Sequence, residues 1–197
     1  GNIDFRIQVS ASSSEYNYYR TFEYNNIIVS IDQLGFPLPG IEFKANSSPL
    51  VIDWNHDGNN EIIFGDKSGF IRILNSNGKQ ISHEKFPYDT GNEIWGSIAA
   101  ADMDSDGLTD FVITSKSKHL YIFDQNGLKI DYNAEKFLIG TPAIGNLDDD
   151  DELEAVFSGY SSNNLLFVVN HDGSDVDGFP FILDEVFDEK TKAGVAL

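Results

Sequence analysis

Short hydrophobic runs, separated by polar and turn residues, follow one another along most of this 197-residue chain. From residue 47 onward the runs repeat one order: a few small apolar residues, an acidic loop, and then further runs rich in β-branched and aromatic residues. Runs of about four to eight such residues, bounded by turn residues, predict β-strands. Helical periodicity of useful length is absent from the sequence. The pattern therefore predicts an all-β fold made of repeated units.

Each repeated unit is predicted to contain four strands. In the first unit the inner run is Ser48–Ile52, and Glu61–Phe64 and Phe70–Leu74 are the next two strands. The third strand of each unit is followed by a turn dipeptide: Asn77-Gly78, Asn126-Gly127 and Asp172-Gly173. Such pairs tolerate the positive φ angles of a type I′ turn and predict a hairpin. The fourth, outer strand is expected to run into Phe86-Pro87 in the first unit and Gly178–Pro180 in the third.

The acidic loop after each inner run carries the candidate chemistry. In Asp102–Asp110, aspartates occupy positions 1, 3, 5 and 9, and Gly107 occupies position 6. Alternate residues of a tight loop can point inward together, and four such carboxylates repel one another unless they are protonated or neutralised. Ca²⁺ accepts oxygen ligands in loose geometry and would neutralise them. The same positions carry oxygen-bearing side chains in Asp53–Glu61 and Asn146–Glu154, which begin 49 residues before and 44 residues after Asp102.

Two other interpretations apply to a single loop of this kind. One is an acidic surface turn without a metal, and the other is an EF-hand, which needs a bidentate Glu at position 12 and a helix on each side. Position 12 counted from Asp102 is Ile113, inside the strand-like run Phe111–Thr114, so the EF-hand is excluded. A recurrence every 44 to 49 residues is typical of a propeller or another repeat array.

Four short antiparallel strands per repeat of this length are typical of a β-propeller blade. The units resemble the FG-GAP/VCBS type of propeller repeat, found in integrin α-chain heads and in many secreted bacterial proteins. The resemblance covers about residues 35–197 and implies a partial propeller of four-stranded antiparallel blades, with a Ca²⁺-binding loop between the first two strands of each blade. The implied blades are at about 47–88, 94–137 and 140–183, with the start of a further blade at 192–197.

The resemblance also implies a ligand set for up to three Ca²⁺ ions, because the family uses side chains at loop positions 1, 3, 5 and 9 and the carbonyl at position 7. The first set is Asp53, Asn55, Asp57, Glu61 and the Asn59 carbonyl; the second is Asp102, Asp104, Asp106, Asp110 and the Leu108 carbonyl; the third is Asn146, Asp148, Asp150, Glu154 and the Glu152 carbonyl. The second loop is expected to bind best. The third departs from the pattern, since Asp151 stands at position 6 and would need the left-handed conformation that glycine adopts freely.

Residues 1–34 lack the loop pattern and are interpreted as a divergent blade or as the tail of a preceding β domain. They contain three strand-like runs, Phe5–Val9, Tyr18–Tyr24 and Ile27–Ile31. At the other end, Gly194–Leu197 aligns with the start of an inner strand. We therefore expect a fragment of a larger propeller, whose open edges would favour self-association.

The composition and charge of the chain limit the classes of partner that it is expected to bind. The chain is 41% hydrophobic, which is ample for a packed core, and its formal net charge of −19 argues against nucleic acid and anionic membrane surfaces. It lacks any apolar run of about 18 residues, so membrane insertion is not expected. There is no cysteine, so the redox compartment cannot be read from disulfides.

Signals for catalysis are weak. The histidines are scattered and form no His-Glu-x-x-His pair, and no Gly-x-Ser-x-Gly elbow occurs. A carboxylate pair for glycoside hydrolysis stays open, although the acidic loops explain most of the clustering. Tyr16, Tyr18 and Tyr19 could form a platform for a sugar or peptide, but their setting favours strand residues. Trp54 and Trp95 are interpreted as packing residues rather than ligand contacts.

Two functions follow from this reasoning. The favoured one is a non-enzymatic, calcium-binding propeller module of a secreted or cell-surface protein, which mediates adhesion or binds a protein or glycan. The alternative is an accessory propeller region of a larger extracellular enzyme, such as a peptidase or polysaccharide-degrading enzyme, whose catalytic domain is absent from this chain.

Overall fold

A computed structural model describes residues 2–12, 14, 16–28, 44–81, 85–148, 150–160 and 165–182. The chain divides into two compact units, Gly1–Pro39 and Gly40–Leu197. The predicted start of a further blade at 192–197 lies outside the described residues. Among the described residues, no helix is long and apolar enough to cross a membrane.

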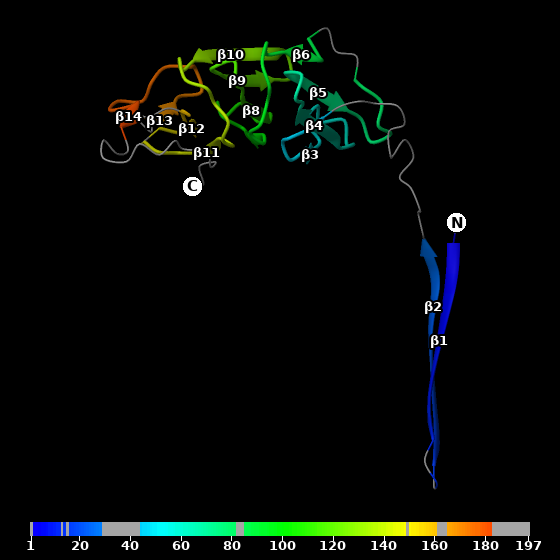
Figure 1. Ribbon diagram of the computed structural model, residues 1–197. Coiled ribbons are helices and arrows are strands. Elements are labelled where there is room, and N and C mark those ends of the chain that lie inside the picture. The colour runs from blue at the N-terminus through cyan, green and yellow to red at the C-terminus, as the bar shows by residue number, and fades with distance from the viewer. Residues whose placement is uncertain are drawn as a thin grey trace. The chain divides into compact units, whose positions relative to one another are not determined.

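The N-terminal unit is a long antiparallel hairpin of β1 (Asn2–Ser12) and β2 (Asn17–Ile28), shown in blue in Figure 1. The second and third strand-like runs of the sequence are therefore one strand as far as Ile28, which corrects the prediction of two. Tyr18 and Tyr19 lie within β2 and pair with Ala11 and Ser10. Both tyrosines are more than half exposed, because a two-stranded ribbon offers no second layer to cover its faces.

The C-terminal unit contains three four-stranded antiparallel sheets, each in simple chain order. The first blade is β3 (Leu50–Ile52), β4 (Glu61–Gly65), β5 (Phe70–Leu74) and β6 (Tyr88–Asp89). The second is β7 (Ala99–Ala101), β8 (Asp110–Thr114), β9 (His119–Asp124) and β10 (Gly127–Asn133). The third is β11 (Ala143–Gly145), β12 (Glu154–Ser158), β13 (Leu165–Val169) and β14 (Phe181–Ile182). The prediction of an all-β fold of four-stranded antiparallel blades is confirmed (Figure 1).

The hydrophobic core lies between neighbouring blades. One buried cluster joins the first and second blades, and another joins the second and third. Alternate residues of β8 divide between them: Phe111 and Ile113 belong to the first cluster and Val112 to the second. Because side chains of a strand point alternately to its two faces, the second blade is buried on both. Its central strands, β8 and β9, therefore carry continuous apolar runs.

The inner strands are tied together by a repeated hydrogen bond. The backbone N–H of Ser48 donates to Ser97 Oγ at 3.0 Å, and the N–H of Ser97 donates to Thr141 Oγ1 at 2.9 Å. These residues stand at equivalent places, shortly before β3, β7 and β11. Each hydroxyl thus satisfies a backbone donor of the preceding blade.

The hairpin turns differ from the type I′ prediction. In the first blade the N–H of Gly78 donates to the Asn75 carbonyl at 2.9 Å, and Gly78 has a φ of 74° while Asn77 has no positive φ. The third blade repeats this bond between Gly173 and Asn170. This is a type I turn followed by a left-handed glycine. That arrangement suits a hairpin loop that is one residue longer than the loop of a type I′ turn.

The outer strands β6 and β14 begin just after the prolines rather than running into them. Tyr88 follows Pro87 and pairs with Ile71, and Phe181 follows Pro180 and pairs with Leu166. Proline has no N–H to donate to the neighbouring strand, so regular pairing resumes at the next residue.

Candidate metal centre

The acidic loops connect the inner strand of each blade to the next strand, and the first two share one scaffold. In the first loop, Asp53 accepts the backbone N–H groups of Asp57 and Gly58, each at 3.0 Å. In the second, Asp102 accepts the equivalent groups of Asp106 and Gly107 at 3.0 and 2.9 Å. The carboxylate at position 1 therefore stabilises the turn of the loop by accepting hydrogen bonds from the backbone N–H groups of positions 5 and 6.

Two positions of this scaffold have left-handed backbone. Gly58 and Gly107 at position 6 have φ of 86° and 87°, as the motif predicts. His56 and Ser105 at position 4 have φ of 56° and 57°, which the sequence reasoning missed. Histidine is several-fold enriched among non-glycine residues with such φ, but serine carries no comparable signal, so the pair could not be recognised from the sequence.

The acid at position 9 is buried in every loop. Glu61, Asp110 and Glu154 are 1–2% exposed, and each begins the second strand of its blade. Each accepts the backbone N–H of position 2: from Trp54 at 3.1 Å, from Met103 at 3.2 Å and from Leu147 at 2.6 Å. Burial raises the pKa of all three carboxyls, and that of Asp110 to about 6. These carboxyls therefore favour the protonated form more than an exposed acid does.

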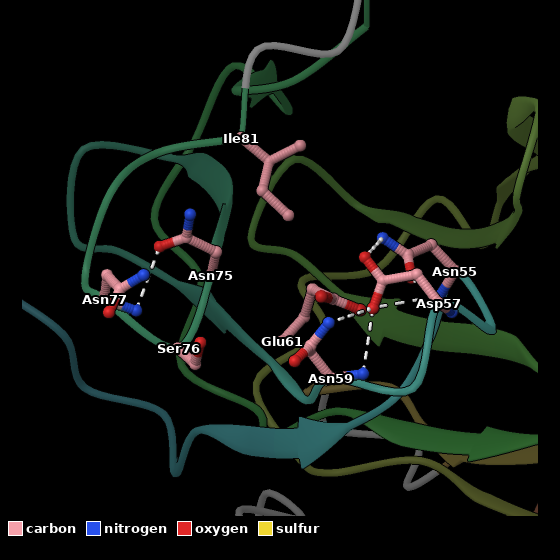
Figure 2. A pocket seen from close by; sticks show the side chains of 8 residues that line it. All are labelled: Asn55, Asp57, Asn59, Glu61, Asn75, Ser76, Asn77 and Ile81. Atoms are coloured by element: carbon pink, nitrogen blue, oxygen red, sulfur yellow. Dashed lines mark hydrogen bonds between the residues drawn. The ribbon is translucent and has the colours of Figure 1, made fainter.

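The first loop opens onto a polar pocket of 380 Å³ (Figure 2). Asp57 Oδ1 accepts the backbone and side-chain N–H groups of Asn59 at 2.8 and 3.0 Å, and Oδ2 accepts Asn55 Nδ2 at 3.2 Å. The bonds from Asn59 lower the pKa of Asp57. Asn75 and Asn77 line the other side of the pocket, so oxygen and amide groups surround the predicted ligands.

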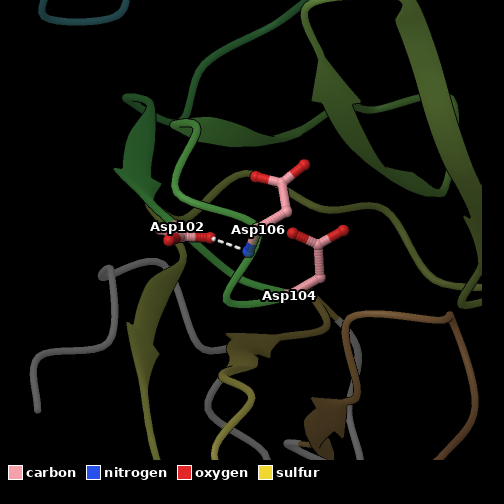
Figure 3. A group of neighbouring side chains, drawn as sticks. All are labelled: Asp102, Asp104 and Asp106. Atoms are coloured by element: carbon pink, nitrogen blue, oxygen red, sulfur yellow. Dashed lines mark hydrogen bonds between the residues drawn. The ribbon is translucent and has the colours of Figure 1, made fainter.

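The second loop gathers its acids but also contains a cation. Asp102, Asp104 and Asp106 have carboxylate oxygens within 4.8 Å of one another (Figure 3). Lys129 of β10 places its Nζ 2.6 Å from Asp104 Oδ2 and 3.6 Å from Asp110 Oδ2. The hydrogen bond from Lys129 lowers the pKa of Asp104, whose Oδ1 is buried without a hydrogen-bond partner. The sequence reasoning missed Lys129, since nothing in the loop motif points to it.

The third loop gathers three acids without such a cation. Asp148, Asp150 and Glu154 have oxygens within 4.8 Å of one another, and among the ion pairs of the described residues none reaches the first or the third loop. Burial raises the pKa of Glu154 and of Asp150, and the charge of Asp148 raises both further. A bound cation would reduce the repulsion between unpaired acids at this spacing.

The prediction that Asp151 takes the left-handed conformation is wrong. Its φ is not positive. Asn146 at position 1 does not accept two backbone N–H groups as Asp53 and Asp102 do; its Nδ2 donates to the Asp150 carbonyl at 2.5 Å. This bond closes the loop by a different route, so position 6 needs no left-handed residue.

Position 7 has the same role in each loop. The N–H groups of Asn59, Leu108 and Glu152 donate to the position 5 carboxylate at 2.8, 2.7 and 3.1 Å. The structure thus brings together three of the predicted acidic ligands in the second loop and three in the third. In the first loop, Asn55, Asp57 and Glu61 line one pocket.

A second pocket, of 490 Å³, lies between the second and third blades and is lined by Trp95, Lys116, Phe137, Ile139 and Tyr160. Trp95 is 42% exposed, whereas Trp54 is 3% exposed and packs edge-on against Phe86 and Phe111. The packing interpretation therefore fits Trp54 but not Trp95. Lys116 Nζ lies 4.5 Å from the centre of the Trp95 ring and 2.6 Å from Glu93 Oε2.

Among the described histidines, only His56 lies in an acidic loop. His56 is exposed, His119 Nδ1 pairs with Asp131 Oδ1, and His171 follows β13 in the hairpin turn. His83 lies outside the described residues. The described histidines therefore do not come together as one group of catalytic side chains.

Four-stranded meanders that stack face to face, each with an acidic loop after its inner strand, define a β-propeller repeat protein. Residues 53–113 match the family model described as FG-GAP-like repeat, so this part of the chain is similar to an FG-GAP-type repeat. The match begins at the first residue of the first loop and extends through the second loop into β8.

No curated protein matches the chain. Among solved structures, a similar chain is found in the "Crystal structure of BBS1N in complex with ARL6DN, soaked with lead", with 12% sequence identity and a TM-score of 0.45. The similarity covers 71% of this chain and 42% of that chain, so the present chain spans less than half of its length.

Proposed function

We propose that this chain is a Ca²⁺-stabilised, non-catalytic propeller module of a secreted or cell-surface protein, which binds a protein or glycan. The observation that carries the proposal is the third loop, where Asp148, Asp150 and Glu154 lie within 4.8 Å of one another without an ion pair among the described residues. A hard cation with flexible oxygen coordination is the partner that such a group favours.

The donor set of the first and third loops fits Ca²⁺. Each offers three carboxylates and one amide oxygen at positions 1, 3, 5 and 9, with a backbone carbonyl at position 7. Ca²⁺ takes about six to eight oxygen ligands, which leaves room for water. A bound ion would supply the missing positive charge and link the inner strand to the second strand. Extracellular Ca²⁺ is high enough to fill sites of modest affinity, which supports a secreted or surface location.

Thermal unfolding in EDTA and in millimolar Ca²⁺ tests the metal proposal. An ion that binds only the folded state stabilises it by about 2.7 kcal/mol at a concentration of 100 times its Kd. For a chain of this size we expect a rise in Tm of about 5–10 °C for each such site. Asp150→Ala should remove the part of the rise in Tm that is due to the ion of the third loop.

Asp177→Ala is the matched control, because Asp177 is an exposed aspartate outside the loops of the same blade. Identical unfolding of the wild type in EDTA and Ca²⁺ would contradict the proposal.

The partner-binding part of the proposal is supported by the pocket around Trp95. Its exposed aromatic rings lie beside the polar groups of Lys116 and Glu93, a combination that is common at protein interfaces. We expect Trp95→Ala to lose a signal that the wild type gives on a glycan array, with unchanged unfolding. A wild type without any array signal would exclude the glycan and direct the search to protein partners.

A further inference from the structure

Lys129 occupies a place that neither of the other two blades provides. In β10, Leu128 pairs with Phe123 and Ile130 pairs with Ile122, so Lys129 is an extra residue between two successive pairs. In the first blade the equivalent residues are consecutive: Gln80 pairs with Leu74, and the N–H of Ile81 donates to the Ile73 carbonyl at 2.9 Å.

The third blade follows the first. Asp175 pairs with Val169, and the N–H of the next residue, Val176, donates to the Val168 carbonyl at 3.1 Å. Lys129 is thus a β-bulge that the equivalent described residues of the other two blades lack. Bulges redirect a side chain, and this one directs an ammonium to the acidic loop of its own blade.

The ammonium binds two of the four predicted ligands of that loop. Lys129 Nζ lies 2.6 Å from Asp104 Oδ2 at position 3 and 3.6 Å from Asp110 Oδ2 at position 9. The lysine side chain is only 20% exposed, so the pair is shielded from solvent. The second loop is also the one with four carboxylates at the ligand positions, where the first and third loops have three and an asparagine.

Ca²⁺ and the ammonium cannot use these carboxylates independently. An ion bonded to Asp104 and Asp110 would lie within a few ångströms of Nζ, and two cations at that distance repel strongly in a partly buried site. We propose that Lys129 is the resident cation of the second loop, holding it closed without metal, while the first and third loops depend on Ca²⁺. This inference rests on the proposed function, because the proposed function is what assigns Ca²⁺ to the first and third loops.

Counting bound Ca²⁺ by isothermal titration calorimetry tests the proposal. Lys129→Met keeps most of the aliphatic stem and removes the charge. We expect it to bind one Ca²⁺ more per chain than the wild type, and an unchanged count would overturn the inference. Lys79→Met is the control, because Lys79 is an exposed lysine beside the turn of the first blade, and it should behave as the wild type.

Asp106→Asn assigns the gained ion to its loop. It should leave the wild-type count unchanged and remove the extra ion from Lys129→Met. A lower count when Asp106→Asn is made in the wild type would show that the second loop binds Ca²⁺ beside Lys129, which would overturn the inference and leave the proposed function standing.

Unfolding in EDTA separates this inference from the proposed function. Lys129→Met should then unfold at a lower temperature than Lys79→Met, because it lacks the internal cation. Equal melting temperatures would overturn the role of Lys129. If the wild type binds no Ca²⁺ at all, the proposed function fails, and the EDTA comparison alone decides whether Lys129 holds the loop.

Discussion

The most constrained residues of the acidic loops are the acids at position 9. Glu61, Asp110 and Glu154 are buried at the start of a strand and accept a backbone N–H from position 2 of their own loop. They join the loop to the sheet. Since burial raises their pKa, any ligand that needs the ionised carboxylate competes with protons at a higher pH than it would at an exposed acid.

We predict that stabilisation by Ca²⁺ increases with pH. Without metal, the pKa of Glu61 and of Glu154 is raised in the folded state, so folding is favoured when these two carboxyls are protonated. Their contribution to stability is present below the ordinary pKa of 4.5 and is lost as pH rises through the pKa of the folded state. Bound Ca²⁺ favours the ionised form, so the difference in Tm between Ca²⁺ and EDTA should grow from about pH 4.5 to pH 7.

Thermal unfolding by circular dichroism at several pH values measures this difference. The double variant Glu61→Gln and Glu154→Gln should flatten its pH dependence. A difference that is the same at every pH in the wild type would argue against metal binding through these carboxyls.

The inner strands of neighbouring blades are joined by hydrogen bonds between the blades. β7 consists of three alanines and lies beside β11. Small side chains allow the close approach, and the hydroxyls of Ser97 and Thr141 then accept backbone N–H groups from the preceding blade. The attachment of one blade to the next therefore combines apolar burial with a polar bond near the inner strands.

We predict that Thr141→Val destabilises the chain by about 1 kcal/mol or more, because the N–H of Ser97 loses its acceptor in a partly buried place. Urea unfolding measures the change. Thr141→Ser keeps the hydroxyl and should retain most of the stability. If both variants lose the same amount, the hydrogen bond is not the cause.

In the molecule as a whole, stability depends on contacts between blades. The middle blade is buried on both faces, and Trp54 reaches from the first loop into the aromatic cluster that it shares with Phe86, Phe111 and Phe123. Gln125 supports the same junction, since its Nε2 donates to the carbonyls of Trp54 and Thr109 at 3.2 and 2.8 Å. Removing an aromatic ring at this junction should weaken two blades at once.

The two tryptophans give a direct test. Trp54→Ala should cost about 3–5 kcal/mol, as expected for a large buried aromatic residue. Trp95→Ala, at an exposed pocket wall, should change stability by about 0.5 kcal/mol. Urea unfolding followed by circular dichroism compares them; similar losses for both would contradict this division of roles.

The sequence by itself determined the strands, their grouping and the place of the acidic loops. The apolar runs of β4 and β8, the small residues of β7 and the return of the nine-residue loop are local patterns, which depend only on residues close together in the sequence. The side chains at positions 1, 3, 5 and 9 could be named for the same reason, because the spacing within one loop decides which of them point inward.

The tertiary structure alone decided what surrounds those loops. Lys129 enters the second loop because the register of β10 slips by one residue. Trp54 is buried because it belongs to the cluster between the first two blades, whereas Trp95 lines an open pocket. Asp151 avoids the left-handed conformation because Asn146 closes the third loop through another bond. Each outcome depends on contacts between residues that the sequence pattern does not pair, since packing and register are set only when the strands meet.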